Sequence, residues 1–272
     1  MDSYRFSNMD SYDTPENAAG SRFFRLTGRS RFYFYFDNFR TYIRSGIAAR
    51  HGKLDADCQI RNSNRNLDLV ERCGGRIHLR GLNFLREVAG EPVVVIANHM
   101  SMLETSTIHA IIREYLDFSF LVKASLLRTP FMKDILTAFK AVPMTRTDPR
   151  ADLKAILTLG KNVIDAKRSM IVFPQATRSR EFQPEHFSSI GVKLAKHAGV
   201  RVLPLALKTD FIGNGKGIFK DLGPIYPGRH VWFEFGAPMT ITGNGRHEQE
   251  EIIRFILSRL DFWKSLEEGS QK

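Results

Sequence analysis

The sequence predicts an α/β protein, a single domain with a largely parallel, helix-flanked sheet that is preceded by N-terminal amphipathic helices. Three apolar runs with many β-branched residues have the composition of buried strands: residues 92–96, 169–173 and 200–207. Between them lie stretches with the pattern of helices: residues 106–112, 149–166 and 188–198. Strands that alternate with helices in this way favour a parallel sheet with helices on its faces.

The remaining elements follow the same local rules. A short helix that ends at a Gly-Gly pair precedes a strand with alternating apolar residues, and a final amphipathic helix closes the chain. Asp148 and Pro149 are a typical start of a helix. The two helices just named cover residues 66–73 and 248–266. The other expected strands cover residues 76–79, 118–122, 141–144, 222–226 and 231–235.

Composition fits one globular domain with an unusual charge. The 272 residues are 43% hydrophobic, and 40 Lys and Arg against 29 Asp and Glu give a net charge of +11. Such a charge implies an anionic partner, which could be a nucleic acid, an acidic membrane surface or a phosphorylated substrate. No aromatic RNA-binding signature is present, and the basic residues are spread along the whole chain, so we do not expect nucleic-acid binding.

The cysteines and the hydropathy of the chain indicate in which cellular compartment the protein works. Cys58 and Cys73 have neither metal-ligand spacing nor a clear reason to pair, which favours a reducing compartment and no metal. The chain contains no secretory signal and no uncharged run of about twenty apolar residues. If the protein works at a membrane, we expect it to lie on the cytoplasmic face as a peripheral protein.

The N-terminal quarter changes character at about residue 22. Residues 1–21 are polar and are expected to be disordered, residues 22–75 form an aromatic-basic helical region, and residues 76–272 form the main domain. An aromatic stripe at helical spacing is edged with arginines: Phe32, Tyr35, Phe36, Phe39 and Ile43, with Arg29, Arg31, Arg40 and Arg44. This pattern suits either an interfacial helix on an anionic membrane or a helix that packs its rings on the core, and both can hold for different residues.

A histidine lies where the strand at residues 92–96 gives way to a helix. Along a regular helix, His99 and Glu104 would point about 140° apart, but with His99 in the preceding turn the carboxylate can fold back onto the imidazole. Glu104 then fixes one ring nitrogen and leaves the other as a general base, a dyad whose nucleophile comes from the substrate. The alternative is a purely structural role, in which His99 stands at the start of the helix and Asn98 or Ser101 caps it.

Spacing alone is weak evidence for this dyad, because about one His-x4-acid pair is expected by chance in this composition. A second pair, His109 and Glu114, lies wholly inside a helix, and its partners face apart.

Four ordered motifs carry a family resemblance. Residues 98–104 (Asn-His-Met-Ser-Met-Leu-Glu) resemble the first block of the glycerolipid acyltransferase family of the lysophosphatidate type, usually Asn-His-x4-Asp. Residues 141–146, 172–179 and 202–207 resemble its second, third and fourth blocks. Glu104 replaces the usual Asp, and Gln175 and Ala176 replace the usual Glu-Gly of the third block.

The resemblance implies transfer of a fatty acyl group from acyl-CoA or acyl-carrier protein to the free hydroxyl of a lysophospholipid. The expected acceptor is 1-acyl-glycerol-3-phosphate, which becomes phosphatidate, with no metal and no cofactor. His99 and Glu104 are then the catalytic dyad. Arg146, Arg178 and, as a weaker candidate, Lys123 are expected to bind the substrate phosphate, although each taken alone is an ordinary surface charge. The expected site-shaping residues are Asn98, Gln175, Thr177 and Pro204; as a proline within a strand, the last should mark a bulge, an edge or a bend.

Two alternatives stay open. One is an acyltransferase with another lysolipid or an amino-lipid as acceptor. The other is a peripheral lipid-binding protein without turnover, for which Gln175 and Ala176 would be signs of drift. The intact residues Asn98, His99, Glu104 and Arg178 argue against this second alternative.

Overall fold

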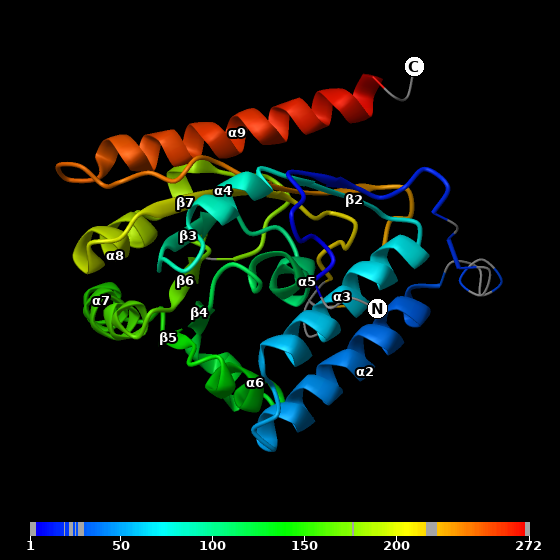
Figure 1. Ribbon diagram of the computed structural model, residues 1–272, viewed down its shortest axis with the longest axis horizontal. Helices are drawn as coiled ribbons and strands as arrows, with labels where there is room; N and C mark the ends of the chain where they lie inside the picture. The colour runs from blue at the N-terminus through cyan, green and yellow to red at the C-terminus, as the bar shows by residue number, and fades with distance from the viewer. Residues whose placement is uncertain are drawn as a thin grey trace.

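The computed structural model describes residues 4–18, 20–21, 24, 26, 30–175, 177–215 and 222–269. Among these residues, an eight-stranded sheet has the order β1-β2-β8-β7-β3-β6-β4-β5 (Figure 1). The strands are β1 (Tyr12–Asp13), β2 (Arg76–Arg80), β3 (Val94–Ala97), β4 (Phe118–Lys123), β5 (Val142–Met144), β6 (Ser169–Val172), β7 (Val202–Lys208) and β8 (His230–Phe235).

Helices connect and cover these strands. They are α2 (Arg31–Arg50), α3 (Ala56–Arg72), α4 (Leu82–Glu87), α5 (Leu103–Ile112), α6 (Met132–Ala138), α7 (Pro149–Asp165), α8 (Ile190–Ala198) and α9 (Arg246–Gly269), with short 3₁₀ turns η1 (Ala124–Arg128) and η2 (Pro184–His186). In the described chain, no helix is both long and apolar enough to cross a bilayer.

The middle of the sheet is parallel, which confirms the predicted fold class. Strands β7, β3, β6, β4 and β5 all run in the same direction, so their carboxyl ends meet at one edge of the sheet. Val95 of β3 lies opposite Leu203 of β7 and Ile171 of β6. Strand β8 is antiparallel to β7 and parallel to β2, so only this flank departs from the parallel pattern.

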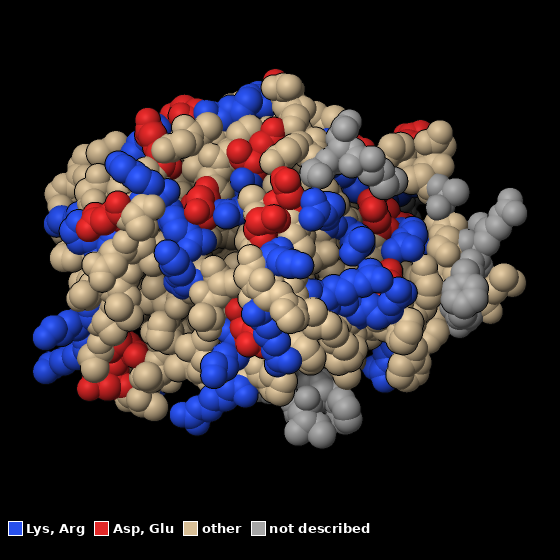
Figure 2. Space-filling model, turned by 60° about the horizontal axis from the view of Figure 1, so that its bottom comes forward, with Lys and Arg blue, Asp and Glu red and all other residues tan. Residues whose placement is uncertain are grey.

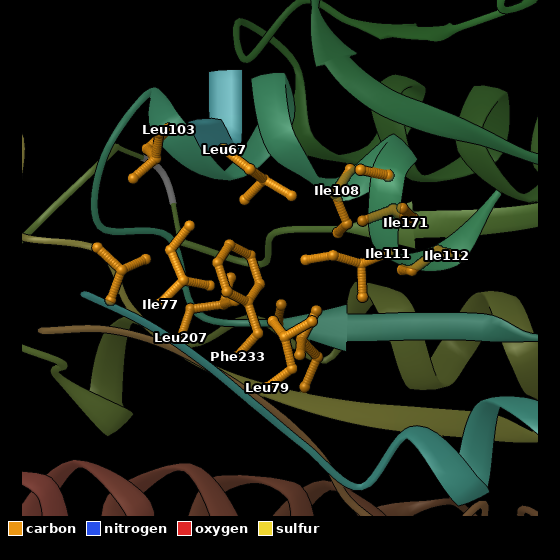
Figure 3. Packing of buried hydrophobic residues seen from close by; sticks show 14 of the residues in the cluster. Leu67, Ile77, Leu79, Leu103, Ile108, Ile111, Ile112, Ile171, Leu207 and Phe233 are labelled. Carbon is orange, nitrogen blue, oxygen red and sulfur yellow. The ribbon is translucent and has the colours of Figure 1, made fainter. Parts of the chain in front are cut away.

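Both faces of the sheet are buried because successive side chains of each strand point to opposite sides. Val95 and Ala97 of β3 pack with α3 and α5 in one hydrophobic cluster, whereas Val94 and Ile96 pack with α7, α8 and α9 in another. Figure 1 shows α9 and the pair α2 and α3 on opposite sides of the sheet. Figure 3 shows the first cluster, including Leu67, Leu79, Leu103, Ile108, Leu207 and Phe233.

Pro204 lies inside β7, yet it costs the sheet little. The antiparallel ladder with β8 ends at the pair Leu205 and Phe235, one residue before Pro204 is reached. The Pro204 carbonyl accepts a hydrogen bond from the Gly236 amide at 2.9 Å, and the missing proline N–H falls where the ladder ends. The proline therefore stands at the end of the ladder with β8, and not on an edge strand, because β7 lies between β8 and β3.

The N-terminal segment corrects the expected disorder of residues 1–21. Its described part includes β1, which pairs with β2, and Phe6, whose side chain is buried. Arg5 forms ion pairs with Asp68 at 2.9 Å and Glu71 at 2.7 Å on α3. These partners lie more than sixty residues away in the sequence, so the polar local composition gave no sign of them.

The region 22–75 shares the core of the main domain. Leu67 and Val70 of α3 are buried in the same cluster as the sheet residues. On α2, Tyr35 is buried, whereas Phe32, Phe36 and Phe39 are 74%, 68% and 56% exposed. Packing on the core therefore holds for Tyr35, whereas membrane contact of the exposed rings stays a prediction; Arg29 lies outside the described residues.

The predicted strand at residues 222–226 is wrong. Within the described residues, this segment forms only an isolated bridge between Ile212 and Ile225. Backbone hydrogen bonds from Gly213 to Pro224 and from Tyr226 to Phe211 hold it against the loop that follows β7. Two prolines and five glycines from residue 213 to residue 228 limit regular pairing here.

Candidate active site

The loop between β3 and α5 is fixed by Asn98. Its side-chain nitrogen donates to the Leu207 carbonyl and its side-chain oxygen accepts from the Leu207 amide, both at 2.8 Å. A carboxamide carries a donor nitrogen and an acceptor oxygen in the same plane, so it can pair with a peptide unit as a neighbouring strand does. Asn98 thus extends the β3–β7 pairing by one residue and sets the position of His99.

His99 and Glu104 form the predicted hydrogen bond, from His99 Nδ1 to Glu104 Oε2. The Glu104 side chain has no solvent exposure, whereas that of His99 is 21% exposed. The imidazole stacks on Phe173, with ring centroids 4.4 Å apart. In the described chain, no group hydrogen-bonds His99 Nε2, so this nitrogen can accept a proton when Nδ1 holds the other.

The second oxygen of Glu104 explains how a buried carboxylate is tolerated. Glu104 Oε1 accepts hydrogen bonds from the Met100 amide at 2.8 Å, the Ser101 amide at 2.9 Å and the Thr209 hydroxyl at 2.6 Å. Thr209 in turn accepts from the Ser101 hydroxyl at 2.9 Å. Glu104 also lies in the first turn of α5, where the helix dipole favours negative charge. These donors and the dipole offset the cost of desolvating a charge.

Gln175 contacts the backbone of the catalytic candidate. Its side-chain oxygen accepts from the His99 amide at 2.6 Å, and the Ser179 amide donates to the His99 carbonyl at 3.0 Å. The loop after β6 therefore holds both backbone groups of His99. The His99 amide needs only an acceptor, so a neutral carboxamide serves here, and the departure from the family's glutamate costs no contact at this point.

The predicted phosphate-binding residues lie at different distances along the sheet edge. Arg178 is half-buried and immediately precedes Ser179, so the structure brings it next to His99. Lys123 ends β4 and Arg146 follows β5, which places them two and three strands from β3, or about 10 and 14 Å at the usual strand spacing. Both are exposed. Thr177 is also exposed, and Ala176 lies outside the described residues.

The turn that carries Arg146 is held by Asp152. Arg146 has a positive φ of 65°, an unusual conformation for a side chain of this size. Asp152 accepts hydrogen bonds from the Thr145 amide at 2.9 Å and the Arg146 amide at 2.6 Å. These backbone donors, with that of Thr145 as the main cause, lower the pKa of the Asp152 carboxyl. The ionised carboxylate therefore fixes the backbone from which the Arg146 side chain starts.

Sequence reasoning missed Thr209 and the hydroxyl role of Ser101. Thr209 directly follows β7 and is fully buried, and it reaches Glu104 because β7 lies next to β3. The only available signal was a polar residue at the carboxyl end of a buried strand, where ligands and catalytic groups gather in α/β folds. That signal could not be used without the sheet order.

The described residues show no cluster of three or more His, Cys, Asp or Glu that could hold a metal ion, and Cys58 and Cys73 are free thiols. Burial raises the pKa of the Cys73 thiol to about 12. Among the described residues, neither cysteine forms a hydrogen bond with the loop that carries His99.

Comparisons with known proteins point in one direction. A family model described as Acyltransferase matches residues 76–208. A 1-acyl-sn-glycerol-3-phosphate acyltransferase of Pseudomonas aeruginosa is 31% identical over 196 residues, which cover 71% of this chain and 68% of that protein. The chloroplastic 1-acyl-sn-glycerol-3-phosphate acyltransferase LPAT1 of Arabidopsis thaliana is 26% identical over 141 residues, 52% of this chain and 37% of that protein.

A solved structure shares the fold. The crystal structure of the 1-acyl-sn-glycerophosphate (LPA) acyltransferase PlsC from Thermotoga maritima matches 86% of this chain and 94% of its own, with a TM-score of 0.63 and 18% sequence identity.

Proposed function

The chain belongs to the glycerolipid acyltransferase family, and from this we propose that it transfers a fatty acyl group from a thioester to the free hydroxyl of a lysophospholipid. The proposed donor is acyl-CoA or acyl-carrier protein, and the proposed acceptor is 1-acyl-glycerol-3-phosphate, which becomes phosphatidate. The acceptor is supported by the names of the bacterial and plastid relatives.

The observation that carries the mechanism is the His99–Glu104 hydrogen bond with Nε2 left available. In the proposed reaction, Nε2 takes the proton of the acceptor hydroxyl as its oxygen attacks the thioester carbonyl. The buried Glu104 carboxylate stabilises the imidazolium that forms. The tetrahedral intermediate then collapses, the carbon–sulfur bond breaks, and the thiolate leaves with the proton that His99 holds.

Positioning of the acceptor is assigned to arginine. A guanidinium binds a phosphate through two parallel hydrogen bonds, and Arg178 lies in the loop that contacts the His99 backbone. Arg146 and Lys123 stand farther along the same edge and would add positive charge around the phosphate. Holding the phosphate there places the free hydroxyl of the glycerol close to Nε2.

A membrane surface is the proposed source of the lipid. Phe32, Phe36 and Phe39 form an exposed stripe on α2, and Arg40 and Arg44 beside them are also exposed. Figure 2 shows Lys and Arg side chains spread across the face that includes the lower side of Figure 1. We propose peripheral binding at the cytoplasmic face of an anionic membrane, with residues 76–272 as the catalytic part and residues 22–75 adding the membrane-facing helices.

The test is release of CoA thiol from palmitoyl-CoA by purified protein, with and without lysophosphatidate. We expect wild-type release to depend on the acceptor and to fall at least about a thousandfold in His99→Ala, because general-base catalysis and the assembled dyad are lost. His51→Ala, at an exposed histidine that ends α2, is the matched control and should keep wild-type turnover. Turnover that survives in His99→Ala would contradict the assigned role.

A further inference from the structure

A second group of arginines surrounds one aromatic ring beside the dyad. The Arg180 guanidinium lies over the Tyr226 ring at 4.9 Å from its centroid, and that of Arg229 lies 4.3 Å from the same centroid. Arg229 is paired with Asp210. Arg180 is exposed, and the described chain offers it no carboxylate partner. Stacking holds its guanidinium plane while the N–H edge stays open to an anion.

Both halves of this cluster are tied to the catalytic loop. The Ser179 amide donates to the His99 carbonyl at 3.0 Å, so Arg180 starts one residue from that contact. The Tyr226 amide donates to the Phe211 carbonyl at 2.9 Å, two residues after the Thr209 that hydrogen-bonds Glu104. Backbone and side-chain lengths then put the Arg180 guanidinium within roughly 15 Å of the His99 backbone.

The sheet order separates Tyr226 and Arg229 from two of the proposed acceptor residues, Lys123 and Arg146, whereas Arg178 lies in the same loop as Arg180, two residues before it. Lys123 and Arg146 follow β4 and β5, on one side of β3. Tyr226 lies against the loop after β7, and Arg229 immediately precedes β8, both on the other side. The single phosphate of a lysophosphatidate lies only a glycerol backbone from the attacking hydroxyl, so it cannot occupy both sides. In a CoA thioester, by contrast, the pantetheine arm separates the phosphates from the reacting sulfur.

We propose that Arg180, held against Tyr226, binds a phosphate of the acyl donor and makes acyl-CoA a preferred donor class. This assignment rests on the proposed acyl transfer, because that reaction requires a donor as well as an acceptor at His99. Arg229 also contacts the Tyr226 ring and so helps to hold it. Because Asp210 neutralises its charge, Arg229 does not compete for the phosphate.

The experiment compares palmitoyl-CoA with palmitoyl-pantetheine, which has the same thioester and no phosphate. For Arg180→Gln, we expect the KM for palmitoyl-CoA to rise about tenfold to thirtyfold with kcat within about twofold, as for loss of one charge-assisted contact. The KM values for palmitoyl-pantetheine and for lysophosphatidate should stay unchanged. Arg180→Lys should recover part of the loss, and Tyr226→Leu should give a smaller rise. Arg254→Gln on the distant α9 removes the same charge and serves as control.

Other outcomes overturn the assignment. A rise in the KM for lysophosphatidate alone would give Arg180 to the acceptor phosphate, and unchanged KM values for both substrates would make it a surface charge. Equilibrium dialysis with free CoA separates this inference from the proposed function. CoA binding that Arg180→Gln weakens tenfold supports the site even if no acceptor is turned over. Turnover of carrier-protein thioesters without CoA binding keeps the acyl transfer and rejects the site.

Discussion

Glu104 is fully buried and accepts hydrogen bonds from two backbone amides, a hydroxyl and an imidazole. The two amides belong to the backbone of Met100 and Ser101, so these contacts do not depend on which side chains those residues carry. The Thr209 hydroxyl is different because it is supplied by another strand and could be replaced by a methyl group without changing the shape of the core. It is therefore the contact through which the carboxylate's orientation depends on the neighbouring strand β7.

Replacing Thr209 tests this dependence. Thr209→Val keeps the side-chain shape and removes a hydrogen bond to a charged group, so we expect kcat to fall about tenfold or more while both KM values stay near wild type. Thr209→Ser restores the hydroxyl and should recover most of the loss. Equal activity in wild type and Thr209→Val, measured by thiol release, would show that the amides and the helix dipole suffice to orient Glu104.

His109 makes the folding stability of the protein depend on pH. It is buried among Phe118, Phe120 and Phe139, with no hydrogen-bond partner for either ring nitrogen in the described chain. Burial lowers its pKa from 6.5 to about 3. Between these two values the unfolded chain binds a proton that the folded chain does not, so folding stability falls as the pH falls below 6.5.

We therefore predict that His109→Phe flattens the acid side of the stability curve. Each pH unit below 6.5 costs the wild type up to about 1.4 kcal/mol from this residue, and the variant escapes that cost. Urea unfolding at pH 7.5, 5.5 and 4.5 should show a difference in unfolding free energy between the two proteins that shifts in favour of the variant as the pH falls. A difference independent of pH would mean that His109 does not titrate in this way; His51→Phe at an exposed position is the control.

Single residues were predictable where their role is local. The fold-back of Glu104 onto His99 follows from a histidine in a turn and a glutamate in the first turn of the next helix, and it is present. Gln175 was expected to shape the site, but its contact with the His99 amide and the role of Thr209 could not be assigned, because each contact depends on which strands adjoin β3.

At the scale of elements, α2 presents two faces. Phe34 and Tyr35 are buried against the core, while Phe32, Phe36 and Phe39 are largely exposed on the other side. Sequence periodicity identified the helix and its aromatic stripe but could not tell which rings were covered, because that depends on where α3 and the sheet lie. Likewise β1 was missed, since a two-residue strand is defined by its partner β2 and by the ion pairs of Arg5, and not by its own composition.

The exposed stripe makes a prediction about membrane binding. Changing Phe32, Phe36 and Phe39 together to Ser removes three rings from the proposed interface, so the affinity for vesicles that contain anionic lipid should fall at least about tenfold. Because these rings are exposed, thermal stability should change little. Vesicle sedimentation measures the affinity, and Phe262→Ser, at a 48% exposed ring on α9, is the matched control. Equal loss in both variants would remove the special role of α2.

The whole molecule is organised by its sheet order. Strand β3 sits between β6 and β7, so loops from three strands that are far apart in sequence meet around His99. Apart from β1 and the wrongly predicted strand at residues 222–226, the individual strands were predicted to within a few residues, because apolar β-branched runs identify buried strands without further information. The order of the strands was not predicted, since the placement of β8 beside β7 and of β2 beside β8 depends on long-range packing that leaves no local pattern. Figure 2 shows Lys and Arg side chains spread over one face of the molecule, in line with the net charge of +11.

The central claim is that His99 and Glu104 act as one unit in proton transfer, and a double-mutant comparison of kcat tests it most directly. We predict that Glu104→Gln lowers kcat at least about a hundredfold, and that His99→Ala combined with Glu104→Gln is no slower than His99→Ala alone, because the glutamate acts only through the imidazole. Losses that multiply in the double variant, or wild-type turnover in Glu104→Gln, would contradict the dyad and leave His99 to act without it.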